Sequence, residues 1–402
     1  MKIELCNNSG TLTKIKVIGV GGAGGNAVNS MIKAHLSGVE FIVANTDAQS
    51  LHKSLADSKI NLGAKLTKGL GAGGDPGIGR KAAEESIQEI EDLLKETDMI
   101  FLVAGMGGGT GTGAAPVIVQ KARDMGVLTL AIVSLPFDYE GLPKKEKASE
   151  GVSGIQNIVD TLLVIPNNLI QKHYKQLSFL DAYGKANEVI ANAARAVADM
   201  INFPALMNVD FADVKSAMKG MGYALMGSGE ATGENRAVEA ATEAITNKLL
   251  ADVNLTGSKH ILMNVTVSSS FMMSEFEQIN EIVTGQTGNF TSIKSSIIID
   301  DEMGDRIKVT IIATGLETSE AVKALPQSIV NAKLNNSTAT QNFEQPTIEN
   351  IYNQDEELSE VMNRIKGSEN KRVIEIKIPT KESQVKDFEL SDAPAFIKKY
   401  YN

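Results

Sequence analysis

The sequence predicts an α/β protein with a parallel sheet, a long central helix and a smaller second α/β domain. Three observations support this fold class. From Lys14 onward, short apolar runs alternate with amphipathic helical periods. A long uninterrupted helical pattern follows, and a second set of alternating runs comes after it. Short apolar strands separated by helices are typical of a parallel sheet covered on both faces, whose ligand loops gather beyond the C-terminal ends of the strands.

The first predicted domain covers residues 14–178 and consists of the alternating runs. In chain order these are IKVIGV, AVNSMIKAHL, VEFIVANTD, AAEESIQEIEDLLKE, MIFLVAG, APVIVQKARDM, VLTLAIVSLP and TLLVIPN. Residues 1–13 precede the domain as an N-terminal tail, and they lack the apolar core of a signal peptide.

Residues 179–203 form the predicted central helix. Apolar positions keep helical spacing from Ala182 to Ile201. Ser178 and Asp181 form an N-cap pair, and Phe203 followed by proline is a stop signal. At 1.5 Å per residue the helix should be about 33–36 Å long, which is enough to cross a small domain.

The predicted second domain covers residues 204–317. Its predicted helices are VKSAMKGMGYALM and AVEAATEAITNKLL, and its predicted strands are HILMNVTV, SIIID and RIKVTIIATGL. Residues 318–386 form a predicted disordered linker, because they are polar and residues 335–370 hold seven acidic against two basic side chains. The last residues, 387–402, regain apolar and basic character in DFELSDAPAFIKKYYN.

Composition excludes several classes of protein. The chain has 402 residues, 43% of them hydrophobic, which is typical of a globular protein. Its net charge of -10 provides no global attraction for nucleic acid. No apolar run approaches the ~18 residues that span a bilayer, so we expect no direct membrane insertion. The single cysteine, Cys6, cannot form an intrachain disulfide, and we expect a cytoplasmic location.

The first apolar run leads directly into a glycine cluster. Gly19, Gly21 and Gly24 fit the dinucleotide fingerprint, and Asp47 follows the next strand where a ribose-binding acid would lie. Glycines let backbone N–H groups approach a phosphate, and the N-terminus of the following helix adds partial positive charge. Taken alone, this loop also fits an NAD(P)-dependent oxidoreductase with a Rossmann-type loop.

A second glycine cluster favours a different chemistry. Residues 105–113 contain six glycines and two threonines in nine positions, between an apolar strand and a helix. Backbone amides in such a loop can surround a triphosphate, whereas a dinucleotide site needs only one loop of this kind. No Walker motif occurs. A third stretch, residues 69–79, is either a flexible loop or a cover for the terminal phosphate.

GGGTGTG at Gly107–Gly113 closely resembles the hallmark loop of the tubulin/FtsZ family. VGGAGGNAVN, VANTDAQ and NVDFADV extend the resemblance over about residues 14–316, and it returns at 387–399. The resemblance implies a filament-forming cytoskeletal GTPase of bacterial cell division, which uses GTP/GDP and Mg²⁺ at the septal ring beneath the inner membrane. It also implies that residues 387–402 bind membrane-anchoring division proteins.

The resemblance also implies a set of nucleotide-binding residues. The two glycine loops contribute Gly21, Gly22, Ala23, Gly24, Gly25 and Asn26, and then Gly105, Gly107, Gly108, Gly109, Thr110, Gly111, Thr112 and Gly113. The loop that orders phosphate and Mg²⁺ contributes Asn45, Thr46 and Asp47. Glu140 resembles the ribose-binding acid, and the base-recognising set is Asn167, Tyr183 and Asn187. Lys144 stands where arginine is usual, and a lysine keeps the charge but loses the bidentate fork.

NVDFADV supplies Asn208, Asp210 and Asp213 just beyond the central helix. By composition alone, such residues at a helix start are caps. Two carboxylates three residues apart can also flank one water or one metal ion. The helix places them some 30 Å from the nucleotide of their own chain. The resemblance implies that they act on the γ-phosphate of a head-to-tail neighbour, a contact that generates an open filament.

Overall fold

The computed structural model describes residues 13–173, 176–203, 205–246, 255, 257–287 and 291–316. The predicted linker, the tail peptide at 387–402 and Cys6 lie outside the described residues. All described residues fall within one compact unit of the chain, residues 1–336.

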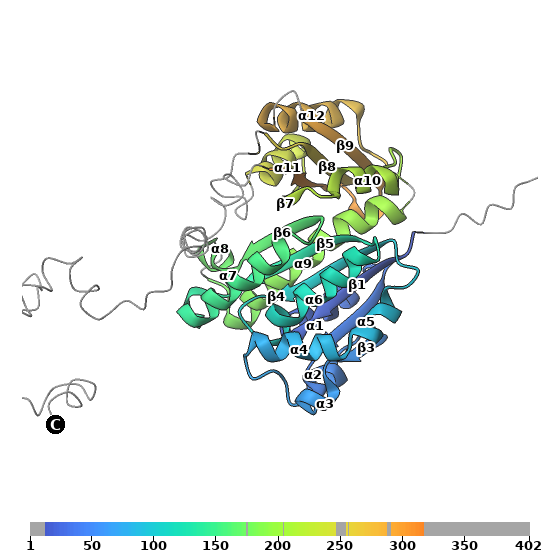
Figure 1. Ribbon diagram of the computed structural model, residues 1–402. Helices are drawn as coiled ribbons and strands as arrows, with labels where there is room; N and C mark the ends of the chain where they lie inside the picture. Colours follow the sequence, from blue (N-terminus) through green and yellow to red (C-terminus); the bar gives the residue numbers. More distant parts are fainter. Residues whose placement is uncertain are drawn as a thin grey trace, which may run out of the picture. The chain divides into compact units, whose positions relative to one another are not determined.

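One mixed sheet runs through the described chain in the order β3-β2-β1-β4-β5-β6-β7-β10-β8-β9 (Figure 1). The strands are β1 (Ile15–Val20), β2 (Glu40–Asn45), β3 (Ser58–Asn61), β4 (Met99–Gly105), β5 (Leu128–Leu135), β6 (Thr161–Pro166), β7 (Gly222–Ala231), β8 (His260–Val267), β9 (Ser292–Ile299) and β10 (Ile307–Thr314). From β3 to β6 every pairing is parallel, which confirms the predicted parallel sheet. The second half is mixed, because β10 runs antiparallel to both β7 and β8.

Helices cover both faces of this sheet (Figure 1). They are α1 (Gly21–Lys33), α2 (Ala48–Lys53), α3 (Ala64–Thr67), α4 (Pro76–Glu85), α5 (Ile87–Leu94), α6 (Thr110–Asp124), α7 (Leu142–Gln156), α8 (Asn167–His173), α9 (Phe179–Asn202), α10 (Phe211–Met218), α11 (Arg236–Ile245) and α12 (Met273–Thr287), with short 3₁₀ turns η1 (Asp138–Glu140) and η2 (Asp301–Met303). One core lies between the sheet and α1, α9 and α10, and the other includes α4 to α7, α11 and α12. Strands buried on both faces explain the continuous apolar runs of the sequence.

The predicted central helix is α9. Ser178 caps it, because its hydroxyl accepts a hydrogen bond from the backbone N–H of Asp181 at 3.1 Å. The helix spans 24 residues and ends where Phe203 adopts an extended conformation. One side of α9 is buried against the first half of the sheet through alanines and valines, so the helix is a fixed spacer within this unit.

Two predicted helices were wrong in extent. VKSAMKGMGYALM is not one helix, because α10 ends at Met218 and residues from Gly222 belong to β7. Gly220 and Gly222 both have positive φ, at 67° and 71°, which ends the helix, and the apolar run that follows pairs with β10. AAEESIQEIEDLLKE divides at Ser86, whose φ and ψ of -94° and 20° leave the helical region between α4 and α5.

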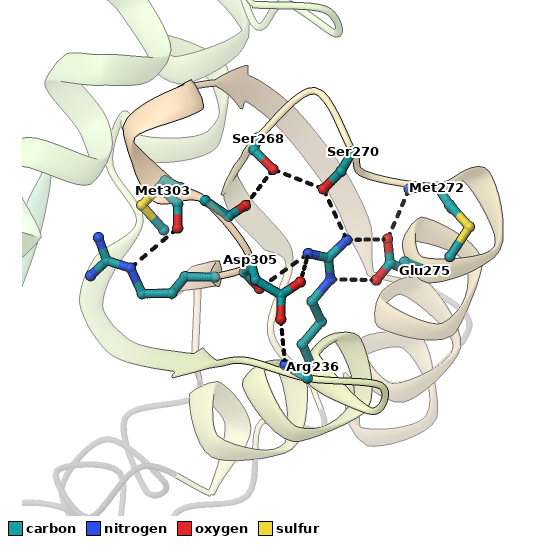
Figure 2. A network of polar contacts seen from close by, with 10 residues as sticks. Arg236, Ser268, Ser270, Met272, Glu275, Met303 and Asp305 are labelled. Atoms are coloured by element: carbon teal, nitrogen blue, oxygen red, sulfur yellow. Dashed lines mark hydrogen bonds and ion pairs between the residues drawn. The ribbon is translucent and has the colours of Figure 1, made fainter.

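A buried polar network fixes the second half of the unit (Figure 2). Arg236, the first residue of α11, donates to both carboxylate oxygens of Glu275 on α12, at 2.7 and 3.1 Å. Its Nη1 also donates to Asp305 Oδ1 at 2.7 Å, just before β10. Arg236 and Glu275 are only 6% and 7% exposed, so this bidentate pair is a firm internal link between three segments.

Candidate functional site

A cavity of about 260 Å³ lies where β1, β4, β5 and β6 end. Its lining residues are Val20, Gly21, Gly22, Ala23, Gly105, Met106, Gly107, Gly108, Gly109, Thr110, Gly111, Ser134, Leu135, Pro136, Glu140, Lys144, Asn167 and Tyr183. The C-terminal ends of parallel strands are where ligand loops were predicted to gather. The structure therefore brings both glycine clusters and part of the predicted base-recognising set to one place.

Two helix N-termini meet at this cavity. α1 begins at Gly21 and α6 begins at Thr110, and both residues line it. Neither helix has an acidic residue in its first turn, and neither has a side-chain cap. The first N–H groups of a helix lack intrahelical partners and carry partial positive charge. This edge of the cavity is suited to bind an anion such as phosphate.

The glycines of the two loops have two different roles. A Cβ on Gly24, Gly111 or Gly113 would come within 2.4, 2.5 or 2.0 Å of a backbone oxygen, so these glycines are required for close packing. A Cβ on Gly22 or Gly108 would meet nothing within 4 Å. Gly22 and Gly108 are therefore the positions where the backbone is open to a ligand.

Threonine hydroxyls tie the loops together. Thr46, which is fully buried at the end of β2, shares a 2.6 Å hydrogen bond with the Thr110 hydroxyl. Thr112 Oγ1 accepts from the Gly107 amide at 2.9 Å, which closes the second glycine loop on itself. The third glycine stretch also packs here, since a Cβ on Gly79 would lie 2.3 Å from the Gly109 carbonyl oxygen.

Tyr183, which lines the other end of the cavity, is held by two aromatic neighbours. The Phe137 ring lies 5.1 Å from the Tyr139 ring in a stacked arrangement and 5.0 Å from the Tyr183 ring in an edge-on one. The Tyr139 hydroxyl donates to the Tyr183 hydroxyl at 3.1 Å. Asn167, which also lines the cavity, is 7% exposed, and its Oδ1 has no hydrogen-bond partner within the described part of the chain. A buried acceptor without a partner is costly, so the site is suited to a ligand that donates an N–H, as a nucleobase does.

Glu140 and Lys144 form the rim of the cavity. Glu140 Oε1 accepts from the Phe137 amide at 2.9 Å, and Oε2 accepts from Lys144 Nζ at 2.7 Å. The Lys144 side chain is 51% exposed. In this arrangement the lysine neutralises the adjacent carboxylate at the edge of the site.

Some predicted site residues do not line the cavity: Gly24, Gly25, Asn26, Asn45, Thr46, Asp47, Thr112, Gly113 and Asn187. Asp47 caps α2, because its Oδ1 accepts from the Gln49 amide at 2.9 Å and its Oδ2 accepts from the Ser50 hydroxyl at 2.6 Å. The Ser50 hydrogen bond also holds the pKa of Asp47 below its usual range. Sequence reasoning missed Val20, Met106 and residues 134–136, whose one local signal is their position at strand ends.

The predicted acids lie elsewhere, on the segment after α9. Asp210 caps α10 by accepting from the Asp213 amide at 2.7 Å. Asp213 Oδ1 lies 2.7 Å from Lys294 Nζ on β9, and this contact holds the pKa of the Asp213 carboxyl below its usual range. Asn208 and Asp210 are exposed. None of the three lines the cavity.

Comparison with known proteins identifies the family. Residues 14–175 match the tubulin/FtsZ family GTPase domain, and residues 222–317 match the FtsZ family C-terminal domain. The cell division protein FtsZ of Coxiella burnetii is 42% identical over 399 residues, which is 98% of each chain. The chain belongs to the FtsZ family. The FtsZ of Pseudomonas aeruginosa is 47% identical over 314 residues, 78% of this chain and 80% of that one.

Solved structures agree with this family. A structure from M. jannaschii described as an empty FtsZ dimer has a TM-score of 0.73 and 38% identity, covering 77% of this chain and 90% of that one. CetZ2 from Haloferax volcanii, at 21% identity and a TM-score of 0.67, covers 82% of this chain and 100% of that one and shares the fold.

Family membership settles the class of function. The chain is a tubulin-type GTPase that binds GTP and GDP and has a cytoskeletal role in cell division. Nothing in these comparisons supports the oxidoreductase alternative that the first glycine loop left open. Within the described ranges, no helix combines the length and apolarity needed to cross a bilayer.

Proposed function

We propose that this FtsZ-family GTPase assembles head to tail and that Asp210 and Asp213 of one subunit complete the hydrolysis of GTP held by the next. The length of α9 supports this proposal. Tyr183 lines the cavity and Asn202 ends α9, so at 1.5 Å per residue the helix separates the two ends by roughly 28 Å. The acids lie beyond the far end and cannot reach the nucleotide of their own chain.

The separation of the two half-sites also determines how subunits would join. The cavity and the acids lie on different surfaces of the subunit. A contact between the cavity of one subunit and the acids of the next is therefore heterologous and does not close after two copies. A relative at 38% identity is described as an FtsZ dimer, which supports self-association. Repetition of the same contact generates a filament.

The chemistry follows from the two half-sites. The N-terminal amides of α1 and α6 would stabilise negative charge on the phosphates as it develops. Asp213 is ionised at neutral pH, and the adjacent Lys294 holds its pKa below its usual range. A carboxylate with a low pKa accepts a hydrogen bond well but is a weak base. Asp210 and Asp213 would therefore orient and polarise the attacking water, with Asn208 in support.

Mg²⁺ fits the phosphate end of the cavity. The Thr110 hydroxyl lines the cavity and is an oxygen ligand of the kind that Mg²⁺ accepts, and its 2.6 Å hydrogen bond to buried Thr46 holds it in place. The ion would neutralise charge on the phosphoryl group. In the described residues no three His, Cys, Asp or Glu side chains gather as a metal site. Mg²⁺ in nucleotide sites commonly relies on substrate phosphates and waters instead.

The C-terminal peptide extends the proposal to cellular location. Residues 387–402 carry apolar anchors at Phe396 and Ile397 and positive charge at Lys398 and Lys399. We propose that they dock on membrane-anchoring division proteins, which place the filament at the division site beneath the inner membrane. A chain without residues 387–402 should still assemble with GTP but should no longer be recruited to anchor-bearing vesicles.

Complementation between two defective variants tests catalysis across the junction. Gly108→Asp places a negative charge in the phosphate cavity without a backbone clash and leaves Asn208, Asp210 and Asp213 intact. Asp213→Asn removes the acid and leaves the cavity intact. Each variant alone should release little phosphate. A mixture should release clearly more than the sum of the two, because a junction between the intact halves is complete.

Two controls define this experiment. Gly108→Asn has nearly the same size without the charge and should retain more GTP binding than Gly108→Asp. The parent protein should lose specific turnover on dilution below the assembly threshold. The proposal is contradicted if the mixture releases no more phosphate than the sum of the two variants and the dilute monomer hydrolyses GTP as fast per subunit as a concentrated sample.

A further inference from the structure

The segment that carries Asn208, Asp210 and Asp213 is hydrogen-bonded to the edge strand β9. The Leu206 amide donates to the Ile297 carbonyl at 2.9 Å, and the Ile297 amide donates to the Met207 carbonyl at 3.2 Å. Three residues before Ile297 on the same strand, Lys294 forms its 2.7 Å ion pair with Asp213. The backbone of this segment and the carboxylate of Asp213 are therefore held by one strand.

The position of this pair has an electrostatic consequence at a subunit junction. Two carboxylates that approach a triphosphate are repelled by it, and this repulsion opposes assembly on GTP. Lys215, two residues further along α10, lies over the Phe211 ring at 6.0 Å. Lys294 is the cation that the structure places directly on Asp213.

The ion pair leaves Asp213 able to bind water. The side chains of Lys294 and Asp213 are 36% and 35% exposed, so both face solvent in the isolated subunit. Lys294 contacts Oδ1, and a carboxylate has about four lone-pair sites, so a water can still be accepted. The lysine fixes the direction of the carboxylate without using all of its capacity.

We propose that Lys294 is a positioning residue for hydrolysis across the junction, and this inference rests on the proposed function of Asp213. Lys294 holds the Asp213 carboxylate against β9 in its ionised form. It also supplies positive charge that offsets the repulsion between Asp210 and Asp213 and the nucleotide of the neighbouring subunit. Lys294 therefore pairs with Asp213 of the same chain. Its effect on hydrolysis is expected only when a second copy of the chain brings GTP to the junction.

Substitution of Lys294 in the full chain tests the role. Lys294→Met should leave GTP binding by dilute subunits unchanged. It should lower turnover per assembled subunit by about three- to tenfold and raise the protein concentration needed for assembly, as expected for loss of a partly exposed pair next to a charged ligand. Lys294→Arg should restore most of both. Phosphate release, sedimentation and nucleotide binding measure these three quantities.

A matched control and a double-mutant cycle make the result decisive. Lys219→Met removes an exposed lysine at the other end of α10 and should change neither turnover nor assembly. The effect of Lys294→Met should disappear when Asp213 is already Asn. The proposal is overturned if Lys294→Met leaves turnover and assembly unchanged, or if Lys219→Met loses as much turnover as Lys294→Met. It is also overturned if Lys294→Met has the same effect on turnover whether residue 213 is Asp or Asn. Full turnover by Asp213→Asn alone instead shows that the proposed role of Asp213 fails.

Discussion

The two ends of α9 are built in different ways. At the cavity end the binding surface is largely backbone, namely two glycine loops and two helix N-termini that packing holds in place. At the acid end the functional groups are exposed or half-exposed side chains. They are held by a cap on α10 and by an ion pair to β9.

This difference indicates how each end tolerates change. A backbone site cannot be adjusted by small side-chain movements, because several of its glycines have no room for a Cβ. A side-chain site can be altered one group at a time without disturbing the fold. We therefore expect substitutions at the cavity end to act through stability and GTP binding, and substitutions near Asp210 and Asp213 to act through turnover and assembly.

The largest expected effect is at Gly113. A Cβ there would lie 2.0 Å from the Pro76 carbonyl oxygen and 2.6 Å from the Arg80 amide, both on α4. Gly113→Ala should lower the free energy of unfolding by about 3 kcal/mol or more and abolish GTP binding, because neither backbone can move freely. Gly108→Ala is the matched control and should change stability by less than about 1 kcal/mol, since its Cβ meets nothing. Denaturant unfolding of the two variants compares them, and equal stabilities would contradict the assignment of roles.

The next largest effect is expected at the acid end. Asp210→Asn keeps an oxygen that can cap α10 but removes the charge that polarises water. Turnover per assembled subunit should fall about 100-fold, in the range seen when one charge-stabilising group is removed from an active site. GTP affinity and thermal stability should remain close to those of the parent. A parallel loss of GTP affinity would break the distinction between the two ends.

A smaller effect is expected at Asp199, in the last turn of α9. Burial raises the pKa of this carboxyl to about 6, despite the opposing influence of Arg195 and Lys308. A raised pKa in the folded state means that stability is lost as pH rises from about 4 to about 6. Asp199→Asn should therefore raise the free energy of unfolding at pH 7 by about 1–2 kcal/mol and have no such effect below pH 4. Denaturant unfolding of the parent and Asp199→Asn between pH 4 and pH 7 measures this difference in the free energy of unfolding.

Asp199→Asn also tests whether α9 does more than separate its two ends. If α9 acts only as a spacer, Asp199→Asn should leave GTP binding and assembly-dependent turnover unchanged while stability rises. A change in turnover would show that the helix also transmits a conformational signal between its ends.

The local sequence signal was stronger at the cavity end than near Asp210 and Asp213. Glycines at 105–113 between an apolar strand and a helix are a local signal with a direct physical meaning, and the structure confirms the parallel sheet that carries them. Contacts between distant segments gave no such signal. Tyr139 meets Tyr183 across 44 residues, and Lys294 meets Asp213 only because β9 lies at the edge of the sheet.

The error at VKSAMKGMGYALM has a related cause. Its apolar spacing fits a helix, and the pairing of residues from Gly222 onward with β10 can be known only from the tertiary structure. The local sequence signal against one continuous helix was the pair Gly220 and Gly222, which have positive φ in the structure. Local patterns therefore predict which elements exist, whereas the sheet decides where each one ends.

The smallest expected effect concerns Lys144, the one lysine among the described residues that lines the cavity. Its ion pair with Glu140 is half-exposed, and such pairs contribute little in water. Lys144→Met should weaken GTP binding by only about two- to fivefold, because backbone amides remain the main phosphate ligands. Lys144→Arg should bind at least as well as the parent, since the guanidinium adds a bidentate fork. Nucleotide titration of the three proteins at low salt measures the differences. A loss of GTP binding as large as that of Gly113→Ala would mean that this side chain, and not the backbone, dominates the cavity end.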